Sequence, residues 1–234
     1  MNPILSKYNI ELEYFNCHAR AEFIRIYLHD HGVPFTDLRR TRPEWHTIKS
    51  DPEKFTPERY PFGQMPVLRL LSKDTGKVEE TISGSLVILG FFQGPPDRGF
   101  KSGMIIDGAN TMEEQVWDST WNPDWDSSEE IAKLAKMVQR FLGYIERLLD
   151  GSYEPLLWDG KNLTAAGAIT LQALVTAAFF MKDGETYPPI LDAFYKKVKA
   201  SSKAWPYLTS EDHSEQRLCM SEYATIDRLH TRIL

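Results

Sequence analysis

A polar stretch between two apolar segments near the start of the chain contains side chains that could act on a nucleophile. Tyr14, Cys17 and Arg20 lie close together in it. A phenol donates a hydrogen bond, so Tyr14 could hold an anion in its charged form. A thiol at a helix N-terminus, where we expect Cys17, can have a lowered pKa and form mixed disulfides. The plainer interpretations are a core aromatic, a buried inert thiol and an exposed helix charge.

A strand, a turn and a helix must position these side chains. Apolar and polar residues alternate over 8–14, which predicts a strand with one buried face. Apolar residues then recur at helical spacing over 19–31, and Gly32 stands where a left-handed helix cap is expected. A second short strand is predicted over 33–41.

Two further strands and a helix complete the predicted N-terminal part. Residues 43–60 are rich in proline and charge, and we expect an irregular loop with short helical turns there. Strand-like runs cover 65–71 and 78–82, and the turn residues between them indicate a hairpin. A helix over 83–92 follows.

The rest of the chain has helical patterns. Two prolines and two glycines within residues 94–99 indicate a linker. We therefore predict an N-terminal domain over 1–93, a linker over 94–103 and an all-helical domain over 104–234. Spacing and capping residues predict helices over 105–118, over 128–149, from Thr164 and from Pro188-Pro189.

Two local motifs resemble those of a known family. The run Tyr14-Phe15-Asn16-Cys17-His18-Ala19-Arg20-Ala21-Glu22 is similar to the tyrosine-bearing turn of sigma-class glutathione transferases, with Ala19 in place of a glycine. Residues 61–68, Pro-Phe-Gly-Gln-Met-Pro-Val-Leu, resemble the segment before the family's third strand, whose proline is cis. The chain thus resembles the cytosolic glutathione S-transferase superfamily, and most of all its sigma-class, tyrosine-type members.

This resemblance implies a fold and a site. The fold would be α/β plus all-α, with an N-terminal thioredoxin-like βαβαββα domain followed by an all-helical domain. Tyr14, supported by Arg20, would stabilise the thiolate of glutathione, which would be the co-substrate. The residues implied to bind glutathione are Trp45, Lys49, Gln64, Met65, Pro66 and Ser83.

Several of these residues would each hold one part of the tripeptide. The backbone of Met65 would pair with the cysteinyl part like a neighbouring strand. Trp45 and Lys49 would lie against the glycine end, where a cation suits a carboxylate. Ser83 would donate to the γ-glutamyl carboxylate at a helix N-terminus, where free N–H groups attract anions.

The chain also departs from the family pattern at three places. Ile82 stands where the family has glutamine or glutamate, so one side-chain contact to glutathione would be lost. Residues 50–60 are several more than the family has before Gln64. Gly167 stands where an aspartate usually caps the buried helix, so that helix would keep only the cap from Thr164.

The helical part would supply the second substrate site and a dimer contact. Trp117 and Trp121 are spaced to share a helical face, and they could either line a hydrophobic substrate site or pack in the core. In the family, an acid in this region reaches the glutathione amine of the partner subunit. Asp107, Glu113 and Glu114 are the candidates, and a homodimer is implied.

The resemblance implies an enzyme that activates the glutathione thiol for attack on a small hydrophobic electrophile, in detoxification or secondary metabolism. One alternative is a glutathione-dependent isomerase or reductase that acts on a biosynthetic intermediate. Another is a non-catalytic ligand binder or structural protein on the same fold. A third is the cysteine-type chemistry of other superfamily members, with Cys17 as the reactive group.

Bulk properties exclude several other classes. A net charge of −6 leaves no basic surface for nucleic acid or an anionic membrane. The two cysteines, Cys17 and Cys219, fit a reducing, cytoplasmic compartment. The apolar run 165–181 is short and contains polar residues, so we interpret it as a buried helix and not a membrane span. His29 and His31 flank a helix end without sharing a face, so no metal is expected.

Overall fold

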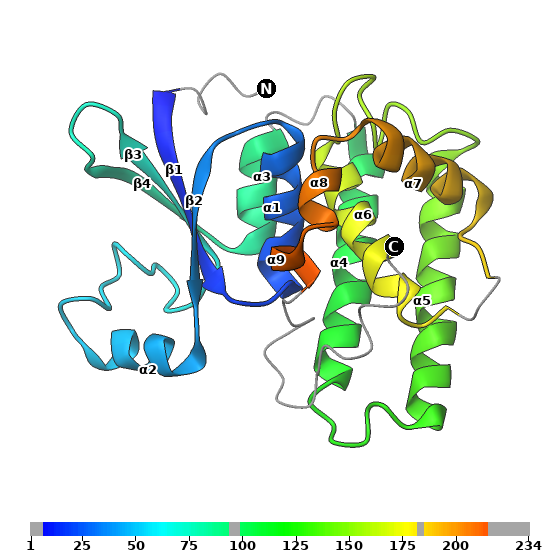
Figure 1. Cartoon of the computed structure of the whole chain (residues 1–234), viewed down its shortest axis with the longest axis horizontal. Coiled ribbons are helices and arrows are strands. Elements are labelled where there is room, and N and C mark those ends of the chain that lie inside the picture. The colour runs from blue at the N-terminus through cyan, green and yellow to red at the C-terminus, as the bar shows by residue number, and fades with distance from the viewer. Residues whose placement is uncertain (1–6, 94–98, 182–184, 215–234) are drawn as a thin grey trace.

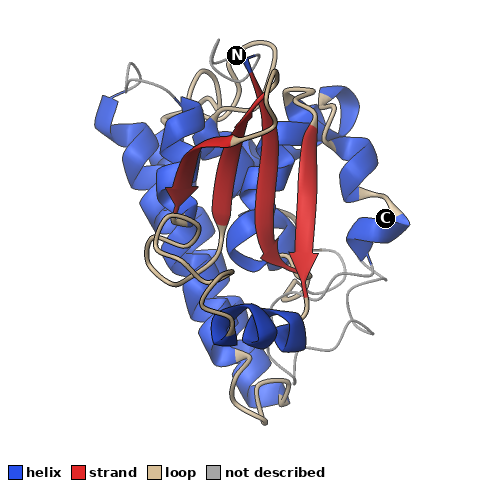
Figure 2. Ribbon diagram, turned by 90° about the vertical axis from the view of Figure 1, so that its left-hand side faces the viewer, coloured by secondary structure: helices blue, strands red, loops and turns tan. Residues whose placement is uncertain are grey.

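The computed structural model describes residues 7–93, 99–181 and 185–214. Cys219 and the first five residues of the predicted linker lie outside these ranges. Four strands form one mixed sheet in the order β2-β1-β3-β4, with bounds β1 Tyr8–Phe15, β2 Phe35–Arg40, β3 Val67–Ser72 and β4 Val78–Ser83. β2 runs parallel to β1, whereas β3 is antiparallel to both β1 and β4. Figure 2 shows this sheet in front of the helices.

Two helices separate the sheet from the helical part. α1 (Ala19–Asp30) and α3 (Ser85–Gln93) stand beside the sheet, and the later helices form a further layer behind them (Figure 1). α1 is buried on nearly every side: Phe23, Ile24 and Ile26 are all 0% exposed. A helix between two layers has no solvent face, which explains its weak amphipathic pattern.

The later helices in the described part of the chain pack around α6. Their bounds are α4 Gly99–Ser119, α5 Ser128–Leu149, α6 Ala165–Ala178, α7 Pro189–Ser201, α8 Trp205–Leu208 and α9 Glu211–Ser214. Every residue from Ala165 to Ala177 is buried, which confirms the prediction of a buried central helix. The predicted N-terminal caps are also present: Ser127 and Thr164 accept hydrogen bonds from the backbone of α5 and α6.

One helix corrects the sequence prediction. For residues 43–60 the sequence predicts an irregular loop with short helical turns, but α2 is a regular helix over Arg42–Ser50. Thr41 and Glu44 form a reciprocal capping box there, and Pro43 lies in the first turn, where its missing N–H removes no bond. The prediction therefore overlooked a strong helix start because of the prolines and charges that follow it.

Two element boundaries also differ from the prediction. Ser83 ends β4 instead of beginning a helix, and α3 begins at Ser85. Gly84 between them has φ +92°, a left-handed conformation that favours glycine. α4 begins at Gly99, so the last five residues of the predicted 94–103 linker are helical.

A single carboxylate joins the end of α1 to the helical part. Asp30 is 1% exposed. Its Oδ2 accepts from the backbone N–H of Leu163 at 2.6 Å, and its Oδ1 accepts from the hydroxyl of Ser202 at 2.5 Å. Both partners lie more than a hundred residues further along the chain.

Candidate functional site

Strand register brings the ends of three segments together. Glu13 of β1 pairs with Val67 of β3, which pairs in turn with Ser83 of β4. The residues just beyond these positions are Tyr14, Pro66 and Gly84, and the Gly84 N–H donates to the Pro66 carbonyl at 3.2 Å. The Met65-Pro66 bond is cis, as the resemblance implied. Tyr14, Met65-Pro66 and Ser83 therefore lie at one end of the sheet.

Tyr14 is well placed to donate a hydrogen bond. It is 6% exposed, and burial raises its pKa above the usual value, while the backbone N–H of Arg20 and the Arg20 charge act in the opposite direction. The phenol is therefore neutral at neutral pH, which is the form that can donate. Ala19, between the strand and the helix, has φ +32°, a conformation that alanine rarely adopts.

The side chain of Arg20 turns toward the helical part. Its Nη1 lies 2.6 Å from Oε1 of Glu114 on α4. Its guanidinium carbon also lies 5.6 Å from the ring centroid of Trp117. Arg20 thus connects the turn that carries Tyr14 with α4, and its backbone N–H acts on the Tyr14 oxygen.

Cys17 has the surroundings of a structural thiol. Its side chain is 0% exposed. Its carbonyl accepts from Nη1 of Arg25 at 2.8 Å. A reactive cysteine needs access for its substrate, so this burial favours the inert interpretation over the cysteine-type one.

The two residues expected at the glycine end differ in exposure. Trp45 is 9% exposed, and it packs edge-on against Phe15, Phe55 and Tyr60. Lys49 is exposed, and its ammonium lies 5.8 Å from the Trp45 ring centroid. Within the described ranges its ammonium makes no ion pair, so it could receive a carboxylate.

The insertion at 50–60 packs against Trp45 and against Glu13 of β1. Phe55 and Tyr60 from this segment cover Trp45, and the Tyr60 hydroxyl donates to Oε2 of Glu13 at 3.0 Å. Glu13 is 0% exposed and also pairs with Arg69 at 2.7 Å. The segment therefore covers a face of the sheet and holds Trp45 from outside the site.

The remaining predicted glutathione-binding residues lie beside the cis peptide bond. Met65 is 9% exposed and Pro66 is buried, whereas Gln64 is exposed and Ser83 is half-buried. Ile82 is half-buried in β4. The exposed Gln64 and half-buried Ser83 are accessible to a ligand at this end of the sheet.

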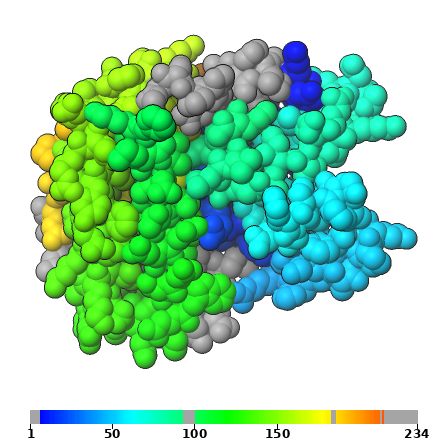
Figure 3. Space-filling model, turned by 180° about the vertical axis from the view of Figure 1, so that it is seen from behind, coloured from blue at the N-terminus to red at the C-terminus, as the bar shows by residue number. Residues whose placement is uncertain are grey.

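Trp117 and Trp121 both meet arginines from the N-terminal part. Trp117 is 5% exposed, and Trp121, in the turn after α4, is 47% exposed. The guanidinium of Arg42 on α2 lies 4.7 Å from the Trp121 ring centroid. Figure 3 shows a hollow between the atoms of α4 and those that follow α2, with N-terminal residues in blue at its base.

The three acids proposed to reach a partner subunit are placed differently. Asp107 is exposed, and Glu114 pairs with Arg20 of its own chain. Glu113 is 0% exposed and points into the interior between α4 and α6. The burial of Glu113 favours Asp107 and Glu114 over it as the acid that reaches a partner subunit.

Comparison with known proteins gives consistent relatives, although no family model matches the chain. It is 28% identical over 176 residues to the class-mu 28 kDa glutathione S-transferase isozyme of Schistosoma japonicum, covering 72% of this chain and 78% of that protein. It is also 28% identical over 128 residues to a glutathione S-transferase of Anopheles gambiae, and over 169 residues to glutathione S-transferase S1 of Drosophila melanogaster. These two matches cover 53% and 70% of this chain, but only 55% and 60% of the relatives.

Solved structures agree over more of the chain. A sigma-class transferase of Fasciola hepatica has a TM-score of 0.68 at 21% identity, and covers 86% of this chain and 95% of its own. A pi-class transferase of Onchocerca volvulus has a TM-score of 0.68 at 20% identity, with 90% and 97% covered. The chain is similar to cytosolic glutathione transferases in sequence and in fold. Their fold, a thioredoxin-like domain followed by a helical one, is the fold predicted from the sequence.

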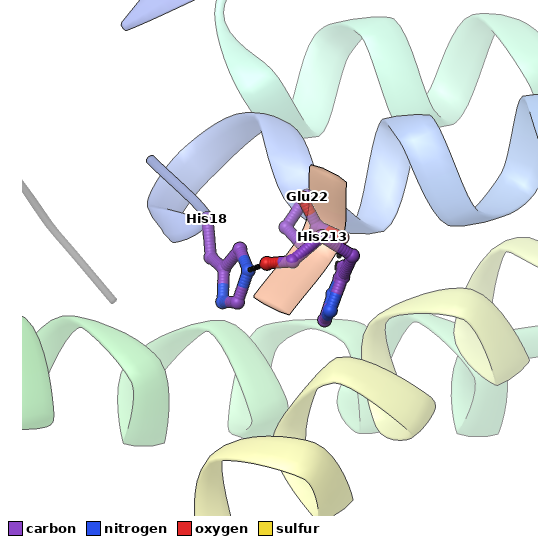
Figure 4. Close-up of side chains that lie close together, drawn as sticks. All are labelled: His18, Glu22 and His213. Atoms are coloured by element: carbon purple, nitrogen blue, oxygen red, sulfur yellow. Dashed lines mark hydrogen bonds and ion pairs between the residues drawn. The ribbon is translucent and has the colours of Figure 1, made fainter. Parts of the chain in front are cut away.

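One buried group in this transferase relative has the composition of a metal site. His18, Glu22 and His213 place one ligand atom each within 4.8 Å of one another, and they are the one such group that we find in the described ranges (Figure 4). The two imidazole rings stack 4.2 Å apart at 23°. Ring lone pairs lie in the ring plane, so stacked rings direct them side by side and not onto one ion.

The same three residues have other partners. The carbonyl of His213 accepts from Nε2 of His18 at 3.0 Å, and Glu22 pairs with Arg25 at 3.3 Å. The Tyr207 hydroxyl donates to Glu22 at 3.1 Å, and Nε2 of His213 lies 3.1 Å from its other oxygen. The group joins α8 and α9 to α1 behind the transferase-like turn.

Sequence reasoning missed the polar groups that link the two parts. His18 and His213 are separated by 195 positions, and no local pattern relates them. Gln172 is a polar residue in the apolar run 165–181, and its amide donates to the Ala19 carbonyl at 3.1 Å. A buried amide needs a hydrogen-bond partner, so a glutamine in a predicted buried helix indicates a polar contact with another segment.

One large cavity lies away from this site. It measures about 610 Å³ and is lined by Tyr8 to Glu11, Gly32 to Thr36, Leu71 and Lys73. β1 begins at Tyr8 and ends beyond Tyr14, so this cavity lies at the opposite end of the strand. It includes none of the predicted site residues. No described helix combines the length and apolar character that crossing a bilayer requires.

Proposed function

We propose that the chain is a glutathione transferase that activates the thiol of glutathione for attack on a hydrophobic electrophile. One observation carries the proposal: the register of β1, β3 and β4 gathers Tyr14, cis Met65-Pro66 and Ser83 at one end of the sheet. This is the arrangement that the resemblance assigns to the binding of the tripeptide and its sulfur.

Tyr14 is the thiol-activating group in this proposal. A free thiol has a pKa of about 8.5, so only a minority is thiolate at neutral pH. The neutral phenol of Tyr14 donates a hydrogen bond to the thiolate and not to the thiol, which lowers the thiol pKa. The sulfur is then a nucleophile that is held in place.

The tripeptide backbone lies across the same end of the sheet. The Met65 backbone pairs with the cysteinyl unit, and Ser83 with the adjacent start of α3 receives the γ-glutamyl carboxylate. The exposed ammonium of Lys49 receives the glycine carboxylate, while Trp45 supports Lys49 from below. Gln64 is exposed beside them and supplies a further polar contact.

The electrophile enters the hollow between α4 and the N-terminal part. Trp121 is the exposed indole there, and it offers an apolar surface beside Arg42. Trp117 is nearly buried and forms the inner wall.

The test is to titrate glutathione bound to wild-type protein and to Tyr14→Phe. The substitution removes one hydroxyl and almost no volume, so packing should survive. Loss of a charge-assisted hydrogen bond of about 1.5–3 kcal/mol should raise the pKa of the bound thiol by roughly one to two units. Turnover at neutral pH should fall while glutathione affinity, measured by calorimetry, changes little.

The outcomes separate the alternatives. A stable thioether product supports conjugation, whereas recovered glutathione with a rearranged or reduced substrate supports an isomerase or reductase. No heat on adding millimolar glutathione would show a non-catalytic binder or structural protein. An unchanged thiolate titration in Tyr14→Phe would contradict the role of Tyr14.

A homodimer is part of the proposal. Large apolar side chains are exposed before β3 and at the starts of α3 and α4: Phe62 is 78%, Val87 62%, Phe100 93% and Met104 54% exposed. Large exposed apolar patches mark protein interfaces. Sedimentation at micromolar concentration should show a dimer, and Phe62→Asp should shift it toward monomer. A wild-type monomer would contradict this assembly.

A further inference from the structure

A buried carboxyl lies between α4 and α6, close to the turn that carries Tyr14. Glu113 is 0% exposed, and its Oε2 accepts from the Gln172 amide at 3.3 Å. No arginine, lysine or histidine pairs with it among the residues that the structure describes. A buried acid without a cationic partner is costly to ionise.

The amide of Gln172 connects this carboxyl to the turn. Its Nε2 donates both to Glu113 and to the carbonyl of Ala19, at 3.1 Å. In the described part of the chain its Oε1 has no hydrogen-bond partner. Two acceptors, Glu113 and Ala19, thus determine which end of the amide faces the turn. Without Glu113, the Gln172 amide could rotate, and its Oε1 would then face the carbonyl oxygen of Ala19 in place of the donating Nε2.

The Ala19 backbone needs such support. Its φ of +32° is strained for alanine, and conformations of this kind persist only where the surroundings fix them. Ala19 directly precedes Arg20, whose backbone N–H acts on the Tyr14 oxygen. A shift at Ala19 would therefore move the N–H that orients the phenol.

We propose that Glu113 is a positioning residue of the thiol-activating turn. By accepting from the Gln172 amide, it keeps that amide donating to the Ala19 carbonyl, and so fixes the backbone that places the Arg20 N–H on Tyr14. The inference deepens the proposed function and rests on it.

The electrostatics add a pH dependence. Burial raises the pKa of Glu113 to about 7, although Thr176, Gln172 and Trp117 favour its charged form. Glu22 on α1 is the charged group that acts on it, and it raises the pKa further. When protonated, Glu113 becomes a donor and suits the Gln172 oxygen instead of its nitrogen. The orientation of the amide should thus change near neutrality.

Three variants test this inference in the full-length protein with glutathione and a chloronitrobenzene electrophile. Glu113→Ala should lower kcat about tenfold, with KM for glutathione within twofold of wild type. Glu113→Gln keeps an acceptor but does not titrate, so it should restore kcat to within about threefold. Asp118→Asn removes an exposed charge from the same helix and should change nothing.

The pH dependence of kcat separates a positioning role of Glu113 from a merely structural one, which would leave this dependence unchanged. Wild type and Asp118→Asn should show an inflection of kcat near pH 7, and Glu113→Gln should lack it. Infrared absorption of a protonated carboxyl should titrate over the same range in wild type and be absent in Glu113→Gln. Gln172→Leu should reproduce the loss of kcat, and adding Glu113→Ala to it should cost little more.

Two results would overturn the inference alone: an active wild type whose kcat is unaffected by Glu113→Ala, or an inflection that persists in Glu113→Gln. If Glu113→Ala fails to fold, Glu113→Gln and Gln172→Leu decide. A wild-type protein that gives no heat with glutathione would instead end the proposed function, and this inference with it.

Discussion

Arg20 Nη1 and Glu114 Oε1 lie 2.6 Å apart and join the turn that follows Tyr14 to α4. Both side chains are more than a third exposed, so the pair contributes only about 0–1 kcal/mol to stability. The pair matters because it changes the electrostatic effect of the Arg20 guanidinium on Tyr14. That charge is near Tyr14, and Glu114 partly neutralises it.

Substitutions of these two residues should therefore act in opposite directions. Arg20→Leu removes a positive charge and should raise the pKa of bound glutathione by a few tenths of a unit or more. Glu114→Gln leaves the positive charge unopposed and should lower that pKa. Thiolate absorbance titrations of both variants check this. Shifts of the same sign would show that the Arg20 charge does not act on the sulfur.

Cys17→Ser should leave glutathione conjugation within about twofold of wild type, because the thiol is buried and the proposed mechanism assigns thiol activation to Tyr14. In protein that carries Cys219→Ser, so that Cys17 is the one thiol left, reaction of the folded protein with a small disulfide reagent should be slow and should accelerate only on unfolding. If Cys17→Ser is inactive but folded while Tyr14→Phe is active, the protein works by cysteine chemistry.

Gly167→Ala should destabilise the protein strongly. A Cβ at Gly167 would lie 2.0 Å from the Leu157 carbonyl oxygen and 2.9 Å from its carbon, and both are backbone atoms. The expected loss is about 3 kcal/mol or more, measured by urea denaturation. Gly143 on α5 has no neighbour within 4 Å of such a Cβ, so Gly143→Ala should instead stabilise by about 0.5–1 kcal/mol. Equal effects of the two substitutions would contradict the close approach at Leu157.

His18 should make the protein sensitive to mild acid. Burial lowers its pKa to about 4, helped by the nearby His213 and opposed by Glu22. An unfolded histidine has a pKa of about 6.5, so below that pH the unfolded chain binds more protons than the folded one. Stability should therefore fall as the pH drops from about 6.5 to about 4, by at most about 3 kcal/mol from this residue.

Urea denaturation between about pH 4.5 and about pH 7.5 measures this change in the free energy of unfolding. The range spans the pH over which the folded and unfolded states differ in protonation, given pKa values of roughly 4 and 6.5. His18→Gln keeps an N–H for the His213 carbonyl but cannot titrate, so its stability should depend less on pH than that of wild type. His46→Gln changes an exposed histidine and should leave the pH dependence intact. An identical slope in His18→Gln and wild type would refute this assignment.

The sequence predicted those helices and strands whose stabilising interactions join residues close together in the chain. The alternation in β1 and the caps at Ser127 and Thr164 are each satisfied within a few residues, so the sequence contains all that is needed. The α2 helix was equally readable from Thr41 and Glu44, and it was overlooked because proline and charge were weighed more heavily than the capping box.

The residues of the candidate site were predictable only where they belong to short sequence motifs. Tyr14 and Met65-Pro66 belong to short runs with a recognisable order, and the structure places them at one end of the sheet. Glu113 was grouped with its exposed neighbours because nothing local shows that its side chain turns inward. Its carboxylate accepts from Gln172 on another helix, 59 positions away, and a contact between residues so far apart leaves no periodic signal in the sequence.

The bonds of Asp30 bear on how the chain could be divided. Its two oxygens hold Leu163 and Ser202, so the end of α1 is fastened to two distant segments of the helical part. A fragment that stops after α3 would leave this carboxylate, and the apolar surface of α1, without their partners. We therefore expect calorimetry to show one melting transition for the whole protein. A chimaera that takes its helical part from a glutathione transferase should fold only when the donor supplies groups equivalent to these two.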